Sequence, residues 1–535
     1  MLSALSHTCA WLAARRFLGG KALIIGIVAF VTTSPFAGPE KNLTSPAPGP
    51  IPVAPKPATS EFDERAVAVV QAAVRTEAVH EIVVAQVAER NEAASQADFW
   101  ATASNEYLAA HYAELEKSYK HLHRHPELSY CETQTSAYLV KQLEGTGFKI
   151  TRNFGGGNAL VAVLRNGDGP TVLVRTEMDA LPITEQTGLP YSSEAESRDR
   201  EGNIVGIMHA CGHDIHMTCW IGTARALAGM RDHWKGTLVF IAQPAEEIGC
   251  GADAMIREGL FTKFPKPDYC LALHCDPQSV AGTITYTPGL AMANIDMVSI
   301  VVRGKGGHGA WPHMTVDPVV LSARLILDLQ TLVSRENNPT DPLVLTVGTV
   351  HGGVKANVIP NEVTLQLTVR TTRDASRRRV LEGIERMAKG VAVSANAPEP
   401  FVKINPNWHT PAVINEPKLL NKTVAILRQG LGDSHVCQRP PMMGGEDFAR
   451  FGREGIASTL LFLGTQAADK VALAEAGDDS ALPSLHSDKF APVMEPTLKT
   501  GVKAMTLAVL NLVGKDPIHP TIRKSSDSTA RSKVR

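Results

Sequence analysis

Three short apolar segments of this chain are each followed directly by acidic or imidazole side chains. The segments and their polar neighbours are TVLVR (171–175) with Glu177 and Asp179, TLVFIA (237–242) with Glu246 and Glu247, and YCLAL (269–273) with His274. Because these β-rich runs alternate with helical segments, they predict an α/β fold with a mostly parallel sheet covered by helices on both faces. The carboxyl ends of parallel strands open onto one crevice, so we expect these side chains to meet there.

The order of elements changes between residues 294 and 405. The expected elements there are a strand (297–304), a helix (317–335), two strands (343–350 and 362–370) and a helix (377–395). A β-α-β-β-α segment of this kind forms a compact α+β sandwich of its own. We therefore expect an inserted domain, after which the larger domain resumes.

The chain ahead of the first strand differs in composition from the rest. Arg15, Arg16 and Lys21 precede an apolar run (22–31), which is typical of an export signal or, if uncleaved, of an N-terminal membrane anchor. An exported protein, periplasmic or secreted, follows from this interpretation. The expected organisation is an export signal or anchor (1–37), a Pro-rich linker (38–60), a helical extension (61–103), a catalytic domain in two parts (104–293 and 406–515), the inserted domain (294–405) and a flexible tail (516–535).

Composition excludes some classes of function. Hydrophobic residues make up 44% and charged residues 20%, which is ordinary globular composition, and the formal net charge of -1 offers no electrostatic attraction for nucleic acid. A small-molecule or peptide substrate fits better. The 8 cysteines are too sparse for a disulfide scaffold in a chain of 535 residues. Export would permit some pairing, but buried free thiols are expected for most of them.

Two local motifs carry metal chemistry. HACGHDIH places Cys211 and His213 two residues apart before a helical run, and both side chains suit zinc and other first-row divalent metals. A lone cysteine is otherwise more often a small buried hydrophobe. PAEE ends in Glu246 and Glu247 after an apolar strand, where adjacent carboxylates are costly unless cations neutralise them or they face water. One carboxylate can then bind a metal while its neighbour acts as general base.

Two further histidines complete a candidate ligand set. His274 ends a strand, and His486 lies far along the chain within SLHSDKF. Each alone would more often be a hydrogen-bonded structural histidine. Together with Cys211, His213 and Glu247, they could hold two metal ions that share a bridging thiolate or water.

Seven motifs in order resemble the aminoacylase/carboxypeptidase family of co-catalytic metallopeptidases. The motifs are RTEMDALP, MHACGHDIH, QPAEEIGCGADAMI, LALHCDP, VRGKGGHGAWPH, NVIPNE and GGEDFA, and the similarity covers about residues 106–513. Within the family, they are most similar to the amidohydrolase branch of hippurate hydrolases, auxin-conjugate hydrolases and N-acetyl-diaminopimelate deacetylases. The resemblance implies hydrolysis of the amide bond of N-acyl amino acids or small peptide-like amides, with two divalent metal ions, manganese or zinc.

The resemblance also implies roles for individual residues. The residues that correspond to metal ligands are Cys211, His213, Glu247, His274 and His486. Glu246 corresponds to the base that deprotonates the attacking water. Asp179 corresponds to a carboxylate that orients a ligand imidazole, although the sequence alone allows a turn-capping role equally well. Glu177 stands where relatives commonly have Asp or His, and we do not assign it as a ligand.

The inserted segment resembles the family's lid and dimerisation domain, which implies a homodimer. His308 corresponds to a histidine that reaches a neighbouring subunit's site and helps to stabilise the tetrahedral oxyanion. Asn357 and Arg370 correspond to lid residues that can hold the free carboxylate of the substrate, a role suited to the fork geometry of arginine. A solvated arginine at a strand end is an equal alternative for Arg370.

Two polar motifs receive no catalytic role. The acids of GGEDFARF (444–451) could line the pocket or cap the following helix. His121, His123 and His125 form a metal-like cluster by composition. Their expected place at a helix end before the first catalytic strand favours a structural role.

Two other functions remain open for the same site. One is a metallo-carboxypeptidase or dipeptidase, which would prefer substrates with a free α-amine. The other is a non-catalytic exported metal-binding protein. The presence of Glu246 beside all five candidate ligands argues against the second.

Overall fold

The structure, a computed structural model, describes residues 77–405 and 409–515, with side chains from residue 96 onward. Three predicted regions lie outside the described residues: the export signal or anchor (1–37), the linker (38–60) and the tail (516–535). The described part of the predicted helical extension belongs to one helix, α2 (Glu77–Arg124). This helix continues into the catalytic domain, where its last turns pack against the core.

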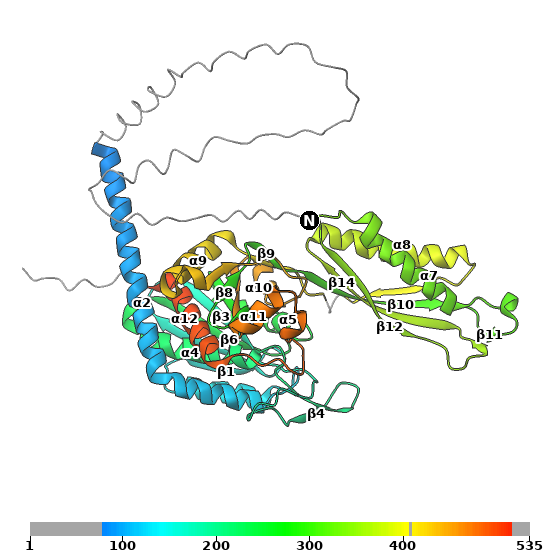
Figure 1. The fold of residues 1–535 in the computed structure, drawn as a ribbon, viewed down its shortest axis with the longest axis horizontal. Coiled ribbons are helices and arrows are strands. Elements are labelled where there is room, and N and C mark those ends of the chain that lie inside the picture. Colours follow the sequence, from blue (N-terminus) through cyan, green and yellow to red (C-terminus); the bar gives the residue numbers. More distant parts are fainter. Residues whose placement is uncertain (1–76, 406–408, 516–535) are drawn as a thin grey trace, which may run out of the picture. The chain divides into compact units, whose positions relative to one another are not determined.

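An eight-stranded mixed sheet forms the centre of the catalytic domain (Figure 1). Its strands, in spatial order, are β1 (Lys149–Phe154), β2 (Ala159–Asn166), β6 (Gly236–Gln243), β3 (Thr171–Glu177), β7 (Tyr269–Val280), β18 (Ala457–Gln466), β8 (Ile284–Tyr286) and β17 (Val436–Gln438). Strand β3 pairs in parallel with both β6 and β7, and β18 pairs in parallel with β7. The predicted mostly parallel sheet is therefore confirmed.

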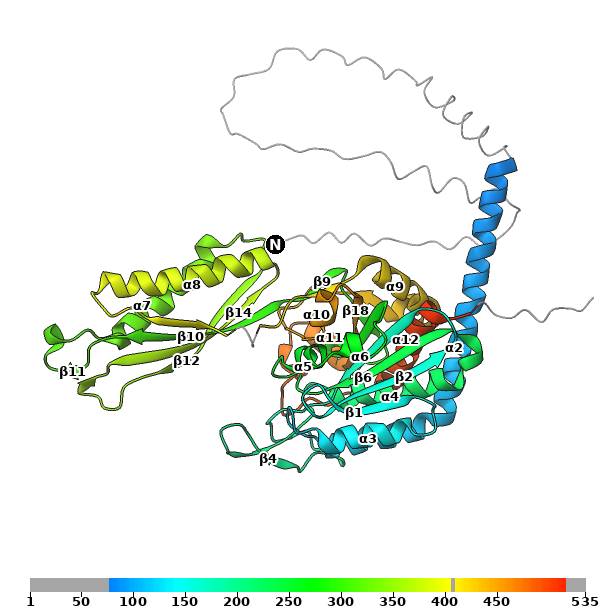
Figure 2. The ribbon, with the colours of Figure 1, turned by 180° about the vertical axis from the view of Figure 1, so that it is seen from behind.

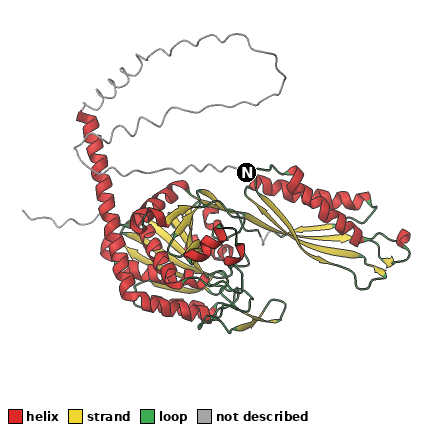
Figure 3. Ribbon diagram, viewed as in Figure 1, coloured by secondary structure: helices red, strands yellow, loops and turns green. Residues whose placement is uncertain are grey.

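Helices cover both faces of this sheet (Figures 2 and 3). The helices are α3 (Thr133–Leu143), α4 (His213–Gly229), α5 (Gly251–Arg257), α6 (Leu260–Lys263), α9 (Pro417–Leu431), α10 (Ala449–Arg453), α11 (Ala468–Glu475) and α12 (Met494–Val513). Side chains alternate along the central strands between two cores. On β3, Val172 and Val174 pack into the core shared with α4 and α12, and Leu173 packs into the core shared with α5 and α10. This double burial explains the nearly continuous apolar character of the strand segments.

The inserted domain is a four-stranded antiparallel sheet with a core of its own. Its strands, in spatial order, are β12 (Leu343–His351), β14 (Glu362–Thr371), β10 (Asn294–Arg303) and β15 (Phe401–Ile404), and its helices are α7 (Pro318–Thr331) and α8 (Asp374–Ser394). One face of β10 and β14 is buried at every second residue against both helices, so the predicted α+β sandwich is confirmed. The sequence prediction missed β15, because four residues are too few to show a clear period.

Short strand pairs complete the described fold. They are β4 (Glu196–Arg198) with β5 (Ile204–Gly206), β9 (Gly289–Met292) with β16 (Val413–Asn415), and β11 (Gly307–His308) with β13 (Val358–Ile359). Among the residues that the structure describes, no helix combines the length and the apolar composition that a bilayer crossing requires. All seven cysteines in this part of the chain are free, and Cys219, Cys270 and Cys275 are buried as small hydrophobes.

Candidate metal centre

The turn before α4 directs a thiol and an imidazole toward one point. Gly212 has φ 82°, a left-handed conformation that favours glycine, and a Cβ at this position would lie 2.7 Å from the Cys275 Sγ. Only glycine tolerates both the positive φ and the close approach of Cys275. The sharp turn places Cys211 on one side and His213, the first residue of α4, on the other, and both side chains are buried.

The acidic pair Glu246 and Glu247 follows a strained backbone position. Ala245 has φ 54°, which costs a residue with a Cβ roughly 1–2 kcal/mol. Glu132 stabilises this conformation, because its Oε1 accepts a hydrogen bond from the Ala245 N–H at 2.8 Å. Glu132 is fully buried. The orientation of the acidic pair is therefore set from the interior of the protein.

His274 and His486 reach the same point from two distant parts of the chain. The Nδ1–H of His274, in β7, donates to the Cys275 carbonyl at 2.9 Å and leaves Nε2 available to a metal. His486 lies in a loop, with 53% of its side chain exposed. Its backbone N–H donates to the Ala210 carbonyl at 2.9 Å, which ties this loop to the turn that carries Cys211.

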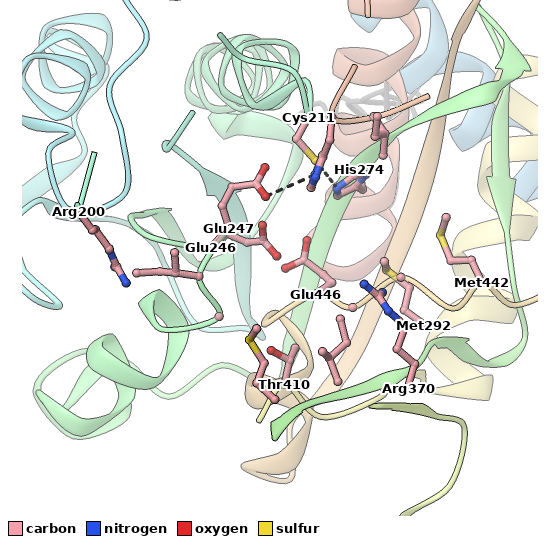
Figure 4. Close-up of a pocket in the computed structure, with 18 residues that line it drawn as sticks. Arg200, Cys211, Glu246, Glu247, His274, Met292, Arg370, Thr410, Met442 and Glu446 are labelled. Atoms are coloured by element: carbon pink, nitrogen blue, oxygen red, sulfur yellow. Dashed lines mark hydrogen bonds and ion pairs between the residues drawn. The ribbon is translucent and has the colours of Figure 1, made fainter. Parts of the chain in front are cut away.

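The five predicted ligands lie together, and Figure 4 shows three of them, Cys211, Glu247 and His274. The Cys211 Sγ is 3.6 Å from the His274 Nε2, the His213 Nε2 is 3.8 Å from the Glu247 Oε1, and the His486 Nε2 is 3.4 Å from the Glu247 Oε2. Donor atoms that bind a tetrahedral zinc ion at about 2.0–2.3 Å lie roughly 3.3–3.8 Å from one another. These separations therefore suit atoms that share cations.

The chemistry of these donors also fits divalent metals. The His213 Nε2 and the Glu247 Oε1 are buried and have no hydrogen-bond partner among the described residues. Atoms in that state are costly unless an ion or another group satisfies them. Burial, with help from Glu247 and Glu246, raises the pKa of Cys211 well above its usual value, so the thiolate requires a nearby cation.

Asp179 links the separate parts of the centre. Its backbone carbonyl accepts a hydrogen bond from the His213 Nδ1–H at 2.6 Å, and its carboxylate accepts the backbone N–H groups of Glu246 at 3.1 Å and Glu247 at 3.0 Å. The carboxylate itself lies 3.6 Å from the His213 Nδ1. The structure thus moves the predicted orienting contact from the carboxylate of Asp179 to its carbonyl, while the carboxylate holds the acidic pair.

A fully buried arginine compensates part of the negative charge behind the centre. Arg175, in β3, pairs with Glu177, with Glu446 at 2.7 Å and with Asp447 at 2.9 Å, and it also donates to Gln243 at 3.0 Å. Burying charged groups is tolerable when they are paired and hydrogen-bonded in this way. Glu177 belongs to this ion network, and the acids of GGEDFARF do as well.

His216 supports the ligand His274 from the side. Burial lowers the pKa of His216 to about 4, so its ring is neutral and can both donate and accept. Its Nδ1–H donates to Glu177 at 3.0 Å, and its Nε2 accepts the Cys275 N–H at 2.8 Å. The backbone beside His274 is therefore held by a side chain from α4.

His123 anchors the beginning of α4. Its Nδ1 lies 2.7 Å from the Asp214 Oδ2, its Nε2 lies 3.0 Å from the Glu185 Oε1, and all three side chains are buried. Burial alone would lower the pKa of His123, but the hydrogen bonds to the two carboxylates outweigh it and raise the pKa to about 9. Asp214 directly follows the predicted ligand His213. His123 therefore has a structural role, as its expected place at a helix end favours.

Four of the predicted ligands, Cys211, Glu247, His274 and His486, line a cavity of about 540 Å³ (Figure 4), a size typical of small-molecule sites. Its apolar wall consists of Ile248, Met292, Ile295, Met297, Met442 and Leu485. Two cations, Arg200 and Arg370, also line it. Arg370 is half-buried and donates to the Met443 carbonyl at 2.8 Å. The cavity thus combines acidic metal-binding groups, an apolar wall and positive charge.

Two predicted site residues lie outside this cavity. His308 and Asn357 are exposed and adjacent, since the Gly309 N–H donates to the Asn357 carbonyl at 2.9 Å. Arg370 pairs with Ile295 at the start of β10, whereas His308 follows the far end of that ten-residue strand, roughly 30 Å away. Within one chain, Arg370 therefore lines the cavity, and neither His308 nor Asn357 does.

Sequence reasoning missed the residues that hold the ligands from behind. They are Glu132, Arg175, Asp214 and His216. For the acids of GGEDFARF the sequence had left pocket lining open, and Glu446 does line the cavity. One signal was present: an arginine inside the apolar segment TVLVR must find charged partners if that strand is buried. The other contacts join residues far apart in the chain, and no local pattern marks them.

Comparisons with known proteins bear on the family and the fold of the chain. Residues 173–487 match the family model described as peptidase family M20/M25/M40. The N-acetyl-L-cysteine deacetylase of Bacillus subtilis (strain 168) is 34% identical over 350 residues, which cover 65% of this chain and 79% of that protein. The thermostable carboxypeptidase 1 of Saccharolobus solfataricus is 32% identical over 397 residues, which cover 74% of this chain and 94% of that protein. A solved structure from Bacillus subtilis, a dinuclear metal-binding peptidase of the M20 family, matches with a TM-score of 0.61 and 30% identity over 76% of this chain and 99% of that chain.

The charge on His123 leads to a prediction about stability. A histidine whose pKa rises from 6.5 to about 9 on folding adds stability that is complete below pH 6.5 and is lost as the pH rises through 9. The contribution is on the order of 3 kcal/mol. We expect His123→Gln to lower the free energy of unfolding by this order at pH 6 and by much less at pH 9. Urea unfolding between pH 6 and pH 9 measures this loss of unfolding free energy, and the exposed His313→Gln serves as control. A loss that does not change with pH would show that His123 is not charged beside Asp214 and Glu185.

Proposed function

This chain belongs to peptidase family M20/M25/M40, and from that premise we propose that its substrates are N-acyl amino acids or small peptide-like amides. It is a metal-dependent amidohydrolase, as its seven motifs predicted. The observation that carries the proposal is the convergence of five candidate metal ligands with Glu246 beside a cavity of small-molecule size, which Glu246 and four of the five ligands line.

Two divalent metal ions are the proposed cofactors, with manganese or zinc as the candidates. The residues that would hold them are Cys211, His213, Glu247, His274 and His486. When bound, the ions would lower the pKa of a water molecule and polarise the acyl carbonyl of the substrate. A mixed set of thiolate, imidazole and carboxylate donors accepts either metal, so supply in the cell would decide between them.

Glu246 is the proposed general base. Its carboxylate lines the cavity at 4.0 Å from the His213 Nε2. Burial and the neighbouring Glu446 raise the pKa of Glu246 well above its usual value, which favours proton uptake. Glu246 takes a proton from the attacking water and delivers it to the amide nitrogen as the C–N bond breaks. The products are a carboxylate and an amine.

The cavity wall suggests how a substrate lies. Arg370 would bind the free carboxylate, because no acid of the described residues forms an ion pair with it and its guanidinium lines the cavity. Met292, Met297 and Met442 would receive the apolar part of the acyl group or side chain. Methionine side chains adapt to different shapes, which favours a range of apolar groups.

A homodimer through the inserted domain would complete the site. Strand β12 is an open edge of the sheet, and α7 exposes Val319, Val320 and Leu327, the last with 71% of its surface accessible. Open edges and clustered exposed apolar groups are typical of interfaces. In such a dimer, His308 and Asn357 of one chain would reach the cavity of the other, where His308 would stabilise the oxyanion.

A metallo-carboxypeptidase or dipeptidase is the second candidate, because the relative from Saccharolobus solfataricus carries a carboxypeptidase name. Comparing matched N-acyl amino acids with unblocked dipeptides separates the two activities. A clear preference for a free α-amine would favour the dipeptidase. The non-catalytic metal-binding protein that the sequence left open does not fit a member of this hydrolase family.

The general base yields a direct prediction. Glu246→Gln should lower kcat for N-acyl amino acids by about 100- to 10,000-fold, because the amide cannot accept the proton of water. Elemental analysis should still find two metal ions per chain. The exposed Glu382→Gln, on α8, serves as control. Full activity of Glu246→Gln would refute the mechanism.

The dimer can be tested by complementation between two inactive variants. Glu246→Gln and His308→Ala chains are unfolded together, mixed in equal amounts and refolded. If His308 acts on the partner's site, half of the dimers are mixed and one of their two sites is intact, so about a quarter of wild-type activity should return. Activity no higher than the mean of the two separate variants would show that His308 does not act in the partner.

We also propose that the protein is exported, on the basis of the N-terminal charge and hydropathy pattern, which lies outside the described residues. Fractionation of cells that produce the full chain should place it in the periplasm, the medium or the membrane fraction. Replacing Arg15, Arg16 and Lys21 by glutamate should retain it inside the cell. Cytoplasmic location of the unaltered chain would contradict export.

A further inference from the structure

Glu446 has one carboxylate oxygen that is firmly held and one that is not. Its Oε1 accepts hydrogen bonds from the Arg175 Nη2 at 2.7 Å and from the Phe448 N–H at 3.0 Å. These two donors orient the carboxylate, and the side chain is only 1% exposed. The Oε2 is buried without a hydrogen-bond partner among the described residues.

The free oxygen belongs to a residue that lines the cavity. The carboxylates of Glu446 and Glu246 point toward one another beside it (Figure 4), and they offer oxygen atoms within 4.8 Å of each other. Two facing carboxylates repel unless a donor lies between them, and a buried carboxylate oxygen without a partner is costly. The position therefore calls for a hydrogen-bond donor. The Oε2 is closed to solvent in this structure, so a substrate in the cavity would supply that donor once the side chains around the Oε2 move aside.

We propose that the Oε2 of Glu446 accepts a hydrogen bond from the N–H of the scissile amide, so that Glu446 is a substrate-binding residue that selects secondary amides. This inference rests on the proposed function, in which Glu246 must reach the same nitrogen to protonate it. A hydrogen bond to the N–H turns the lone pair of the developing amine away from Glu446 and toward Glu246. Both carboxylates then act on the amide nitrogen. Glu446 accepts the hydrogen bond from its N–H, and Glu246 delivers the new proton to its lone pair.

This role has a consequence for specificity. A site built to receive an N–H discriminates strongly against an analogue that lacks it, because the buried acceptor is then left unpaired. Tertiary amides, such as N-acyl-N-methyl amino acids, and esters of the same shape should therefore be poor substrates. The preference resides in Glu446 and not in Arg370, which meets the other end of the substrate.

The variant Glu446→Gln tests the inference with little change of shape. The glutamine oxygen can accept from Arg175 and Phe448 as the carboxylate does, which turns the NH₂ group toward the cavity and replaces an acceptor by a donor. The probes are N-benzoylglycine and the ester O-benzoylglycolate, which differ only in N–H against O. For the amide, we expect kcat/KM to fall about 10- to 100-fold, whereas the ester should be unaffected or improved. The exposed Glu454→Gln should leave the ratio of the two rates unchanged.

Several outcomes would overturn the inference. An equal loss for amide and ester would show that Glu446 acts only through the surrounding ion network. A loss confined to unblocked dipeptides would show that it binds an α-ammonium group. A measurement that needs no variant is the rate of the wild-type enzyme on N-benzoyl-N-methylglycine, which should be at least about 10-fold below that on N-benzoylglycine. Similar rates would overturn the inference alone, whereas absence of activity on every N-acyl amino acid would contradict the proposed function as well.

Discussion

Buried negative charge is the constraint on which the rest of this structure depends. The buried or nearly buried carboxylates around the cavity are Glu177, Asp179, Glu246, Glu247, Glu446 and Asp447. One fully buried arginine, Arg175, pairs with part of this set, and the remaining charge is balanced if cations bind between Cys211, the histidines and Glu247. Metal binding and stability of the site would therefore be coupled, because bound cations would offset the buried carboxylate charge.

Accurate placement of these charges comes from contacts outside the ligand set. Gly212 permits the turn that separates Cys211 from His213, and Glu132 holds the strained Ala245 ahead of the acidic pair. Asp179 joins the two halves, since it contacts His213 through its carbonyl and the acidic pair through its carboxylate. A metal site needs this second layer, because its ligands would come from the turn at the start of α4, the segment after β6, strand β7 and a distant loop.

The inserted domain contributes to the cavity only at its base. Ile295 and Arg370, opposite each other where β10 begins and β14 ends, line the cavity, while His308 and Asn357 lie beyond the other end of β10. One chain therefore provides the five candidate ligands, Glu246 and two arginines, but not every polar residue that the family resemblance assigns to the site. This separation is the physical basis for proposing that a second copy supplies the remainder.

The sequence by itself determined the fold class and the metal chemistry. Apolar strand segments followed by acids and imidazoles predict a sheet with a reactive edge. Glu246 and Glu247 stand out because adjacent carboxylates are expensive to bury without cations, and Cys211 and His213 stand out because two metal-binding side chains lie two residues apart. Only the tertiary structure decided which groups support them. The pairing of Glu132 with Ala245, of His123 with Asp214 and of Arg175 with Glu446 joins residues 91 to 271 positions apart. Such contacts depend on chain packing and leave no periodic or local pattern, so a free oxygen such as that of Glu446 becomes visible only when its neighbours are in place.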